Sequence, residues 1–271
     1  MKNIVLFDMD GTLTKPRKVM ESNIIPALRE LAKHAEIGIV TGSDYDYVHQ
    51  QIGMLLERSE LRYRIHILPC NGTKYYPPPD SANNEYRLAH QVNMREKLGE
   101  THFRALVSYL LQRQHLMKLY DIPFTGHHID YRGSMINWCP IGRNANDNDR
   151  KTFIDFDTRN NVSFRQEEIR GFKIRINKDM SIKDIVIKMG GDTSFDIFPT
   201  GWDKTYCLRH FPNHKHYFVG DRCEKTGNDW ELYETLRGVG RGFKTTGPEQ
   251  TSQIIFDKII PAILSSEEDN G

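Results

Sequence analysis

The sequence has few of the features that mark secreted, membrane-spanning and metal-stapled proteins. Its 271 residues include only four cysteines, Cys70, Cys139, Cys207 and Cys223, and no two of them form a CxxC pair. Scattered cysteines of this kind supply neither a disulfide framework nor a zinc site, so we expect reduced thiols in a cytoplasmic protein. No apolar run is long enough to span a bilayer. The opening "MKNIVLF" is too short for the apolar centre of a secretory signal.

The sequence also lacks an excess of charge of either sign. The formal net charge is +1 at pH 7, which creates no field that attracts nucleic acid or an anionic membrane, so we expect neither as a partner. The eleven histidines form no HExxH motif and no His/Cys set at zinc spacing. With 38% hydrophobic and 27% charged residues, the composition is that of a globular protein of one large domain or two modest ones.

Short apolar runs alternate with segments whose apolar residues recur at helical spacing. The runs lie at residues 4–7, 37–40, 65–68 and 217–219, and the helical segments start near Ser22 and around Val48. Continuous apolar strands separated by amphipathic helices are typical of a parallel sheet that is covered on both faces. The fold class predicted for this part is therefore α/β, with a parallel sheet.

The middle of the chain follows a different pattern. Residues 74–86, "KYYPPPDSANNEY", have the composition of a linker. Beyond them lie a helical segment over residues 103–111 and the strand-like runs "HHIDYR", "SMINWCPIG", "FKIRIN" and "SFDIF". We therefore predict a discontinuous core, residues 1–83 and 198–271, interrupted by an inserted α+β domain over residues 84–197.

Carboxylates follow two of the predicted strands. In "VLFDMDGTLT" the first strand ends at Asp8 and Asp10, and in "HYFVGD" the last strand ends just before Asp221. Because the carboxyl ends of parallel strands meet at one edge of a sheet, we expect these residues to lie together. Converging carboxylates repel one another unless a cation lies between them, and Mg²⁺ prefers oxygen ligands beside substrate phosphates. Asp8, Asp10 and Asp221 therefore predict a magnesium site.

The same edge of the sheet holds the groups that phosphoryl transfer needs. An ionised Asp8 is a nucleophile toward phosphorus, and Asp10 can give a proton to the leaving oxygen and take one back. Thr41 ends the second strand with a hydroxyl for the phosphoryl group, and Lys204 brings an ammonium group to the point where the chain returns to the core. The pair Asn228 and Asp229 of "GDRCEKTGND" supports them.

Each motif taken alone has an ordinary structural explanation, because Asp-Gly is a common turn pair and a single lysine usually faces solvent. As an ordered set, DxDGTxT, a strand-end Thr, a Lys and GD…ND resemble the haloacid dehalogenase (HAD) superfamily of phosphotransferases.

A closer resemblance extends over nearly the whole chain. The stretches "DGTLTKPR", "GSDYDYVHQQIG", "RGSMINWCPIGR", "GGDTSFDIFPTGWDKTYCL", "GNDWELYETLRGVG" and "GPEQT" are similar to the eukaryotic-type phosphomannomutase family. The resemblance implies a Rossmann-like parallel-sheet HAD core with an inserted α+β cap domain and a cytosolic homodimer joined through the caps. It also implies conversion between mannose 6-phosphate and mannose 1-phosphate. It also implies Mg²⁺ and a hexose 1,6-bisphosphate that activates the enzyme.

The resemblance assigns roles residue by residue. Asp8 matches the nucleophile and Asp10 the general acid/base, while Asp8, the backbone carbonyl of Asp10 and Asp221 match the Mg²⁺ ligands. The sugar-phosphate contacts fall on Arg17, Arg132, Arg143, Arg150, Ser194 and Asp196. Such residues suit a mutase, which must hold a second phosphate away from the nucleophile, because the planar fork of arginine fits phosphate. An aspartate within "SFDIF" can accept hydrogen bonds from sugar hydroxyls.

Two departures from the family pattern leave alternatives open. Thr41 stands in "TGSD" where the family has "GGSD", as in the phosphatase branch of the superfamily, so a sugar-phosphate phosphatase is a second candidate. Thr235 and Gly238 stand where the family has Asp and Thr, so we do not predict a second cation site. A non-catalytic sugar-phosphate-binding protein is a third candidate, which the presence of Asp8, Asp10, Lys204 and Asp221 disfavours.

Overall fold

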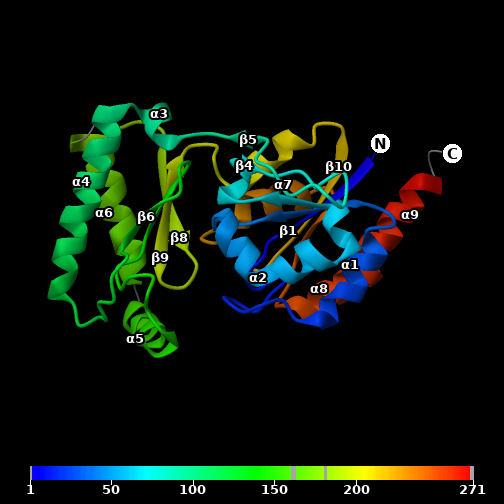
Figure 1. The fold of residues 1–271 in the computed structure, drawn as a ribbon. Coiled ribbons are helices and arrows are strands. Elements are labelled where there is room, and N and C mark those ends of the chain that lie inside the picture. Colours follow the sequence, from blue (N-terminus) through cyan, green and yellow to red (C-terminus); the bar gives the residue numbers. More distant parts are fainter. Residues whose placement is uncertain (1, 160–162, 180–181, 269–271) are drawn as a thin grey trace. The chain divides into compact units, whose positions relative to one another are not determined.

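The computed structural model describes residues 2–159, 163–179 and 182–268. It divides the chain into two units (Figure 1). The core unit comprises the chain up to Gln91 and again from Trp202 onward, and the inserted unit comprises Val92–Gly201. Among the residues placed here, no helix has both the length and the apolar character needed to cross a membrane.

The core unit is built on a parallel sheet whose central strand carries the first aspartate motif. Its strands stand in the order β11-β10-β1-β2-β3, and every neighbouring pair is parallel. Their bounds are β1 Lys2–Phe7, β2 Glu36–Val40, β3 Ile65–Leu68, β10 His214–Gly220 and β11 Gly242–Lys244. This pairing confirms the predicted parallel α/β sheet. Its apolar strands are buried on both faces, as is typical of parallel sheets.

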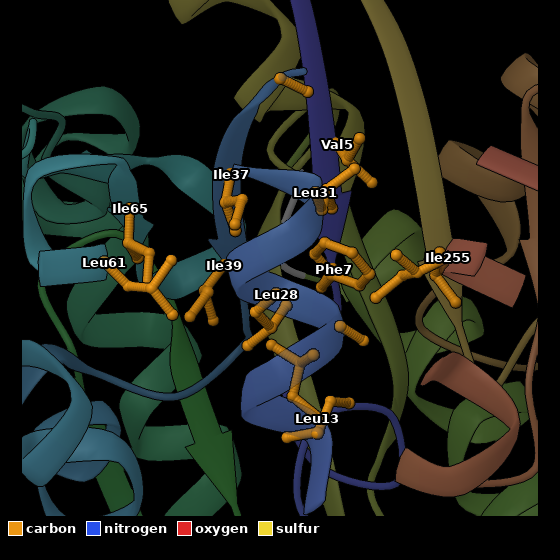
Figure 2. Packing of buried hydrophobic residues seen from close by; sticks show 14 of the residues in the cluster. Val5, Phe7, Leu13, Leu28, Leu31, Ile37, Ile39, Leu61, Ile65 and Ile255 are labelled. Carbon is orange, nitrogen blue, oxygen red and sulfur yellow. The ribbon is translucent and has the colours of Figure 1, made fainter. Parts of the chain in front are cut away.

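Helices cover both faces of this sheet. Successive side chains of a strand point to opposite faces, and Val5 and Phe7 pack on one side while Ile4 and Leu6 pack on the other. Figure 2 shows Leu28 and Leu31 of α1 beside Phe7 and Ile39 in the first of these layers. That layer holds α1 Ile25–Leu31, α2 Tyr45–Arg58, α8 Pro248–Ile254, the π-helix η6 Ile255–Ile259 and α9 Ile260–Glu268.

The second face of the sheet is covered by α7 Trp230–Arg237 and the 3-10 helix η5 Lys204–His210. Between these elements, the described part of the core also has the 3-10 helices η1 Ser22–Ile24, η2 Glu60–Tyr63 and η3 Cys70–Gly72. A two-residue antiparallel pair, β4 Lys74–Tyr75 with β5 His90–Gln91, lies just before the chain enters the inserted unit.

The inserted unit is an antiparallel sheet with helices. The strand order is β6-β7-β9-β8, with β6 Ile129–Tyr131, β7 Ile136–Trp138, β8 Ile185–Gly190 and β9 Ser194–Pro199. Its helices are α3 Met94–Leu98, α4 Glu100–Leu116, η4 Met117–Leu119, α5 Asp147–Thr158 and α6 Phe164–Asp179. Figure 1 shows α4 and α6 along one face of this sheet.

Two local predictions were wrong. Residues 74–86 are not a linker, because they include β4 and because the Tyr86 hydroxyl donates to the carbonyls of Arg62 and Ile65, each at 2.9 Å. This packing keeps the segment in the core unit. The inserted unit therefore begins at Val92 rather than at residue 84, and it ends at Gly201 rather than at residue 197.

The second error concerns "FKIRIN", which was predicted as a strand and lies within the helix α6. The same residues also fit a helix that buries one face. Phe172 and Ile176, four residues apart, are buried, while Ile174 between them is 55% exposed. Residues four apart share one face of a helix, and burial of that pair favours the helical alternative.

Candidate active site

The loop after β1 brings Asp8 and Asp221 close together. Asp8 follows the last residue of β1, and its backbone N–H donates to the carbonyl of Val219 on the neighbouring strand β10 at 2.9 Å. Gly11 adopts a φ of +82°, and a Cβ atom there would collide with the carboxylate of Asp221. Glycine is therefore required at this position both for its backbone conformation and for the space beside Asp221.

Asp229 completes a cluster of three carboxylates. Oxygen atoms of Asp8, Asp221 and Asp229 all lie within 4.8 Å of one another. Lys204, the first residue of η5, has a fully buried side chain. Its Nζ donates to Asp8 Oδ1 and, at 2.5 Å, to Asp229 Oδ1. The structure thus places Lys204 beside the predicted nucleophile, although 196 residues separate the two in the chain.

The pKa values of this cluster indicate an excess of negative charge. Burial, with the charges of Asp229 and Asp221, raises the pKa of Asp8 well above its ordinary value even though Lys204 opposes the shift. Burial and Asp229 raise the pKa of Asp221 to about 6. Burial by itself lowers the pKa of Lys204, but Asp229 and Asp8 outweigh it and raise this pKa. One ammonium group therefore does not neutralise three carboxylates.

The cluster fits a divalent cation of the Mg²⁺ type. Its donors are all carboxylate oxygens, which is the ligand class that Mg²⁺ prefers. Two buried oxygens on the segments that carry the cluster, Thr12 Oγ1 and Asn228 Oδ1, accept or donate no hydrogen bond within the described part of the chain. Buried polar atoms of this kind are usually satisfied by a bound group or water. Asp8, Asp221 and Asp229 are thus the side chains able to hold the cation.

The side chain of Asp10 points elsewhere. Its Oδ1 accepts hydrogen bonds from the backbone N–H of Arg17 at 2.8 Å, from Gln51 Nε2 at 2.9 Å and from the Tyr47 hydroxyl at 3.4 Å. The predicted metal contact of Asp10 is its backbone carbonyl and stays a prediction. Thr41 is buried at the end of β2, where its Oγ1 accepts from the N–H of Ser43 at 3.2 Å.

A second polar cluster lies in the sheet of the inserted unit, with Asn137 at its centre. Asn137 on β7 stands directly opposite Asp196 on β9. Its Nδ2 donates to Asp196 Oδ1 at 2.7 Å and to Ser194 Oγ at 2.9 Å, while its Oδ1 accepts from Arg143 Nη1 at 3.0 Å. Three of the predicted sugar-phosphate contacts therefore converge on one asparagine.

Two arginines and an aspartate border this cluster. Arg132 Nε donates to Asp130 Oδ2 at 2.9 Å, and Arg143 Nε lies 3.6 Å from the same oxygen. Burial and the nearby charge of Arg132 lower the pKa of Arg143. Two guanidinium groups beside one another suit an anionic ligand such as a phosphate.

The other predicted contacts have different surroundings. The Arg150 guanidinium donates to the carbonyl of Ala145 at 3.1 Å, to Thr193 Oγ1 at 2.8 Å and to the carbonyl of Arg143 at 3.2 Å, so it braces the loop that carries Arg143. Arg17 lies in the core unit, where it is exposed and has a positive φ of 60°.

Sequence reasoning missed or underrated some polar residues of these clusters. Asp229 was assigned a supporting role, but it shares Lys204 with Asp8. Asn137 and Gln51 were not singled out, although each is a buried polar residue within an apolar pattern. A polar side chain at such a position needs a partner in the folded state, and that was the available signal.

Comparison with known proteins gives relatives that match nearly end to end. A sequence profile described as eukaryotic phosphomannomutase matches residues 24–261. The chain is 34% identical to a phosphomannomutase of Dendrobium officinale over 252 residues, which cover 92% of this chain and 91% of the relative. It is 33% identical to a phosphomannomutase of Drosophila melanogaster over 260 residues, which cover 94% of each chain.

Solved structures share the fold at much lower identity. A C-terminally truncated IMP-nucleotidase of Plasmodium falciparum aligns with a TM-score of 0.63 and 14% identity over 94% of this chain and 70% of that one. A trehalose-6-phosphate phosphatase of Aspergillus fumigatus aligns with a TM-score of 0.50 and 13% identity over 94% of this chain and 91% of that one. Both comparisons concern the fold alone.

Proposed function

Because the chain belongs to the eukaryotic phosphomannomutase family of the HAD superfamily, we propose that it interconverts mannose 6-phosphate and mannose 1-phosphate through a phosphoryl group carried on Asp8. The observation that carries the proposal is the buried contact of Asp8 with Lys204 at the carboxyl end of the central strand, beside Asp221 and Asp229. Ligands of open parallel sheets bind at this end.

In the first half-reaction, a carboxylate oxygen of Asp8 attacks one phosphorus of a hexose 1,6-bisphosphate. The bond from that phosphorus to the sugar oxygen breaks, and a hexose monophosphate is left. Mg²⁺ bound at the carboxylate cluster supplies positive charge for the phosphoryl oxygens. Lys204 holds Asp8 in place and contributes a second positive charge. Asp10 gives its proton to the leaving sugar oxygen, which avoids the release of an alkoxide. Thr41 offers its hydroxyl to the transferring group.

The second half-reaction reverses these steps with the free hydroxyl of a mannose monophosphate. Asp10 takes the proton of the incoming hydroxyl, and the phosphoryl group moves from Asp8 to that oxygen. This transfer forms a hexose 1,6-bisphosphate, which then gives its other phosphoryl group back to Asp8 and leaves as the second monophosphate. Added bisphosphate loads Asp8 in the same way and so activates the enzyme.

The polar cluster of the inserted unit provides the recognition that a mutase needs. We assign the distal phosphate to Arg132 and Arg143, two arginines that both lie beside Asp130. Ser194 and Asp196, both held by Asn137, accept hydrogen bonds from the sugar hydroxyls. Arg150 supports Arg143. Arg17, which belongs to the core unit, is also assigned to the sugar phosphate.

The same family resemblance underlies two coarser proposals. A homodimer joined through the inserted unit is supported by apolar side chains that this unit exposes to solvent, among them Leu111, Leu119 and Ile174. A cytoplasmic location is supported by four buried cysteines that form no disulfide.

The decisive experiment follows two products at once. Pure protein is incubated with Mg²⁺, mannose 1-phosphate and a trace of glucose 1,6-bisphosphate, and both mannose 6-phosphate and free phosphate are measured over time. We expect mannose 6-phosphate as the main product, stimulation by the bisphosphate and only slow release of phosphate. Asp8→Asn should lower turnover by several orders of magnitude because the nucleophile is lost. The exposed Asp257→Asn should leave turnover unchanged.

Two outcomes would overturn the proposal. Phosphate released at the main rate without any effect of the bisphosphate would identify a sugar-phosphate phosphatase, in which water takes the phosphoryl group from Asp8. Binding of mannose 1-phosphate with no turnover of either kind would identify a non-catalytic binding protein.

A further inference from the structure

Gln51 is a polar residue on the apolar side of a helix. It lies on α2 beside Val48, Ile52 and Leu55, all of which are buried, and it is itself only 3% exposed. A buried amide costs free energy unless its donors and acceptor are satisfied. Both ends of the Gln51 side chain are hydrogen-bonded, and both partners belong to the loop that follows β1.

The hydrogen bonds fix which end of the amide faces Asp10. Thr14 Oγ1 donates to Gln51 Oε1 at 2.6 Å, while its distance to the carbonyl of Met9 is 3.2 Å. Met9 already accepts backbone bonds from Leu13 at 2.9 Å and from Thr14 at 3.0 Å. With its oxygen held by Thr14, the amide of Gln51 directs Nε2 to Asp10 Oδ1 at 2.9 Å.

We propose that Gln51 is a positioning residue that orients the Asp10 carboxyl group for proton transfer to the leaving oxygen. This role rests on the proposed function, in which Asp10 is the general acid. Gln51, Tyr47 and the backbone N–H of Arg17 all donate to Oδ1. With Oδ1 occupied in this way, Oδ2 is the oxygen that carries the proton to the leaving group.

The backbone of Gln51 also holds the segment that carries Arg17. The N–H of Met20 donates to the carbonyl of Gln51 at 2.9 Å. Arg17 adopts a φ of 60°, a conformation that non-glycine residues adopt at a cost. Gln51 therefore anchors the end of the segment from Lys15 to Met20, and the N–H of Arg17 is held against Asp10 within it.

A loss of this orientation has a chemical signature that a general loss of structure lacks. Protonation by Asp10 matters when the leaving group is a basic oxygen, and it matters little when the leaving group is a stable anion. Phenyl phosphate releases a phenol with a pKa of about 10, close to that of a tyrosine side chain, whereas p-nitrophenyl phosphate releases a much more acidic phenol. The two substrates have nearly the same size.

The test compares kcat/KM on these two aryl phosphates with Mg²⁺ present, because kcat/KM reports the step in which the leaving group departs. Gln51→Met keeps the length of the side chain and removes the amide. We expect it to lower kcat/KM on phenyl phosphate by about tenfold to a hundredfold, the contribution of a hydrogen bond to a charged group. The loss on p-nitrophenyl phosphate should stay within about threefold. The neighbouring exposed Gln50→Met should change neither value.

Asp10→Asn provides the reference. It should lower kcat/KM on phenyl phosphate more than Gln51→Met does, again with a much smaller loss on p-nitrophenyl phosphate. If Asp10→Asn is selective and Gln51→Met lowers both substrates equally, Gln51 is only structural and the inference is wrong. If Asp10→Asn shows no selectivity, the assignment of Asp10 fails and the role of Gln51 fails with it. If the wild type releases phosphate from mannose 1-phosphate and forms no 6-phosphate, the mutase proposal fails, while the selectivity of Gln51→Met still decides this inference.

A second variant keeps the inference testable if Gln51→Met does not fold. Thr14→Val removes the hydroxyl that holds Gln51 Oε1 but leaves the amide in place. We expect the same selectivity as for Gln51→Met, with a smaller loss on phenyl phosphate. Equal losses on the two substrates in a variant that folds would overturn the inference.

Discussion

Replacement of Lys204 by methionine keeps a long apolar stem but removes the ammonium group that contacts two buried carboxylates. In the wild type, Nζ donates to Asp8 and Asp229, and the side chain is completely shielded from solvent. Methionine leaves the cluster of Asp8, Asp221 and Asp229 without a positive charge from the chain at its centre. We expect the variant to be markedly less stable in the absence of metal.

The magnitude follows from the burial of the lysine. Removal of one partner of a buried ion pair costs about 3–5 kcal/mol, because an uncompensated charge stays buried. Here the loss should lie near the lower end, since the pKa of Asp8 is already raised by burial and this carboxyl group can take up a proton. A loss of about 3 kcal/mol lowers the melting temperature of a unit of this size by about 10 °C.

The assay is urea unfolding followed by circular dichroism, with EDTA and then with Mg²⁺. The matched control is Lys244→Met, which removes an ion pair of 3.2 Å to Glu224 whose side chains are 53% and 52% exposed. An exposed pair contributes about 0–1 kcal/mol, so the control should lose little. Mg²⁺ should restore part of the loss in Lys204→Met, because a divalent cation supplies the missing charge.

An equal and small loss of stability in the two variants would refute this account of Lys204. It would mean that the ammonium group does not neutralise Asp8 and Asp229 in solution. A large loss that Mg²⁺ leaves unchanged would refute the assignment of the cation to the same carboxylates.

Three other predictions test separate parts of the structure. Gly11→Ala should raise the Mg²⁺ concentration needed for half-maximal activity, because the new Cβ meets the Asp221 carboxylate; an unchanged Mg²⁺ titration would contradict this. Burial lowers the pKa of His66 to about 4, so its contribution to stability is present above pH about 6.5 and is lost as the pH falls toward 4. Between pH 7 and pH 5, the free energy of unfolding measured with urea should fall by about 2 kcal/mol less in His66→Gln than in the wild type. Asn137→Ala should lower kcat/KM on mannose 1-phosphate by about tenfold or more, because Asp196 and Arg143 lose a partner; an equal loss on p-nitrophenyl phosphate would show a merely structural role.

The convergence of Asp8 and Asp221 could be predicted from the sequence because it depends on a general rule. Both residues follow apolar runs, and the carboxyl ends of parallel strands share one edge of a sheet. No knowledge of the strand order was needed beyond the fact that the two strands belong to the same sheet. In the structure β1 and β10 are direct neighbours.

Other features depended on contacts that no local pattern shows. The "FKIRIN" pattern fits a strand and a helix equally well, and only the burial of Phe172 and Ile176 distinguishes them. The partners of Gln51 and Asn137 lie at Asp10 and Asp196, 41 and 59 residues away in the chain. A buried amide in a sequence pattern indicates that a partner exists, but the fold decides which one it is.

The position of β1 in the middle of the sheet also bears on how the protein is made. β1 pairs with β2 on one side and with β10 on the other, and β10 begins at His214, roughly 150 residues after β3 ends at Leu68. At about 5–20 residues per second, a ribosome needs about 7–30 s to synthesise the intervening chain. During this time an apolar edge of the nascent sheet lacks its partner strand. Such an edge pairs readily with other chains, so the newly made N-terminal segment is a natural client for chaperones.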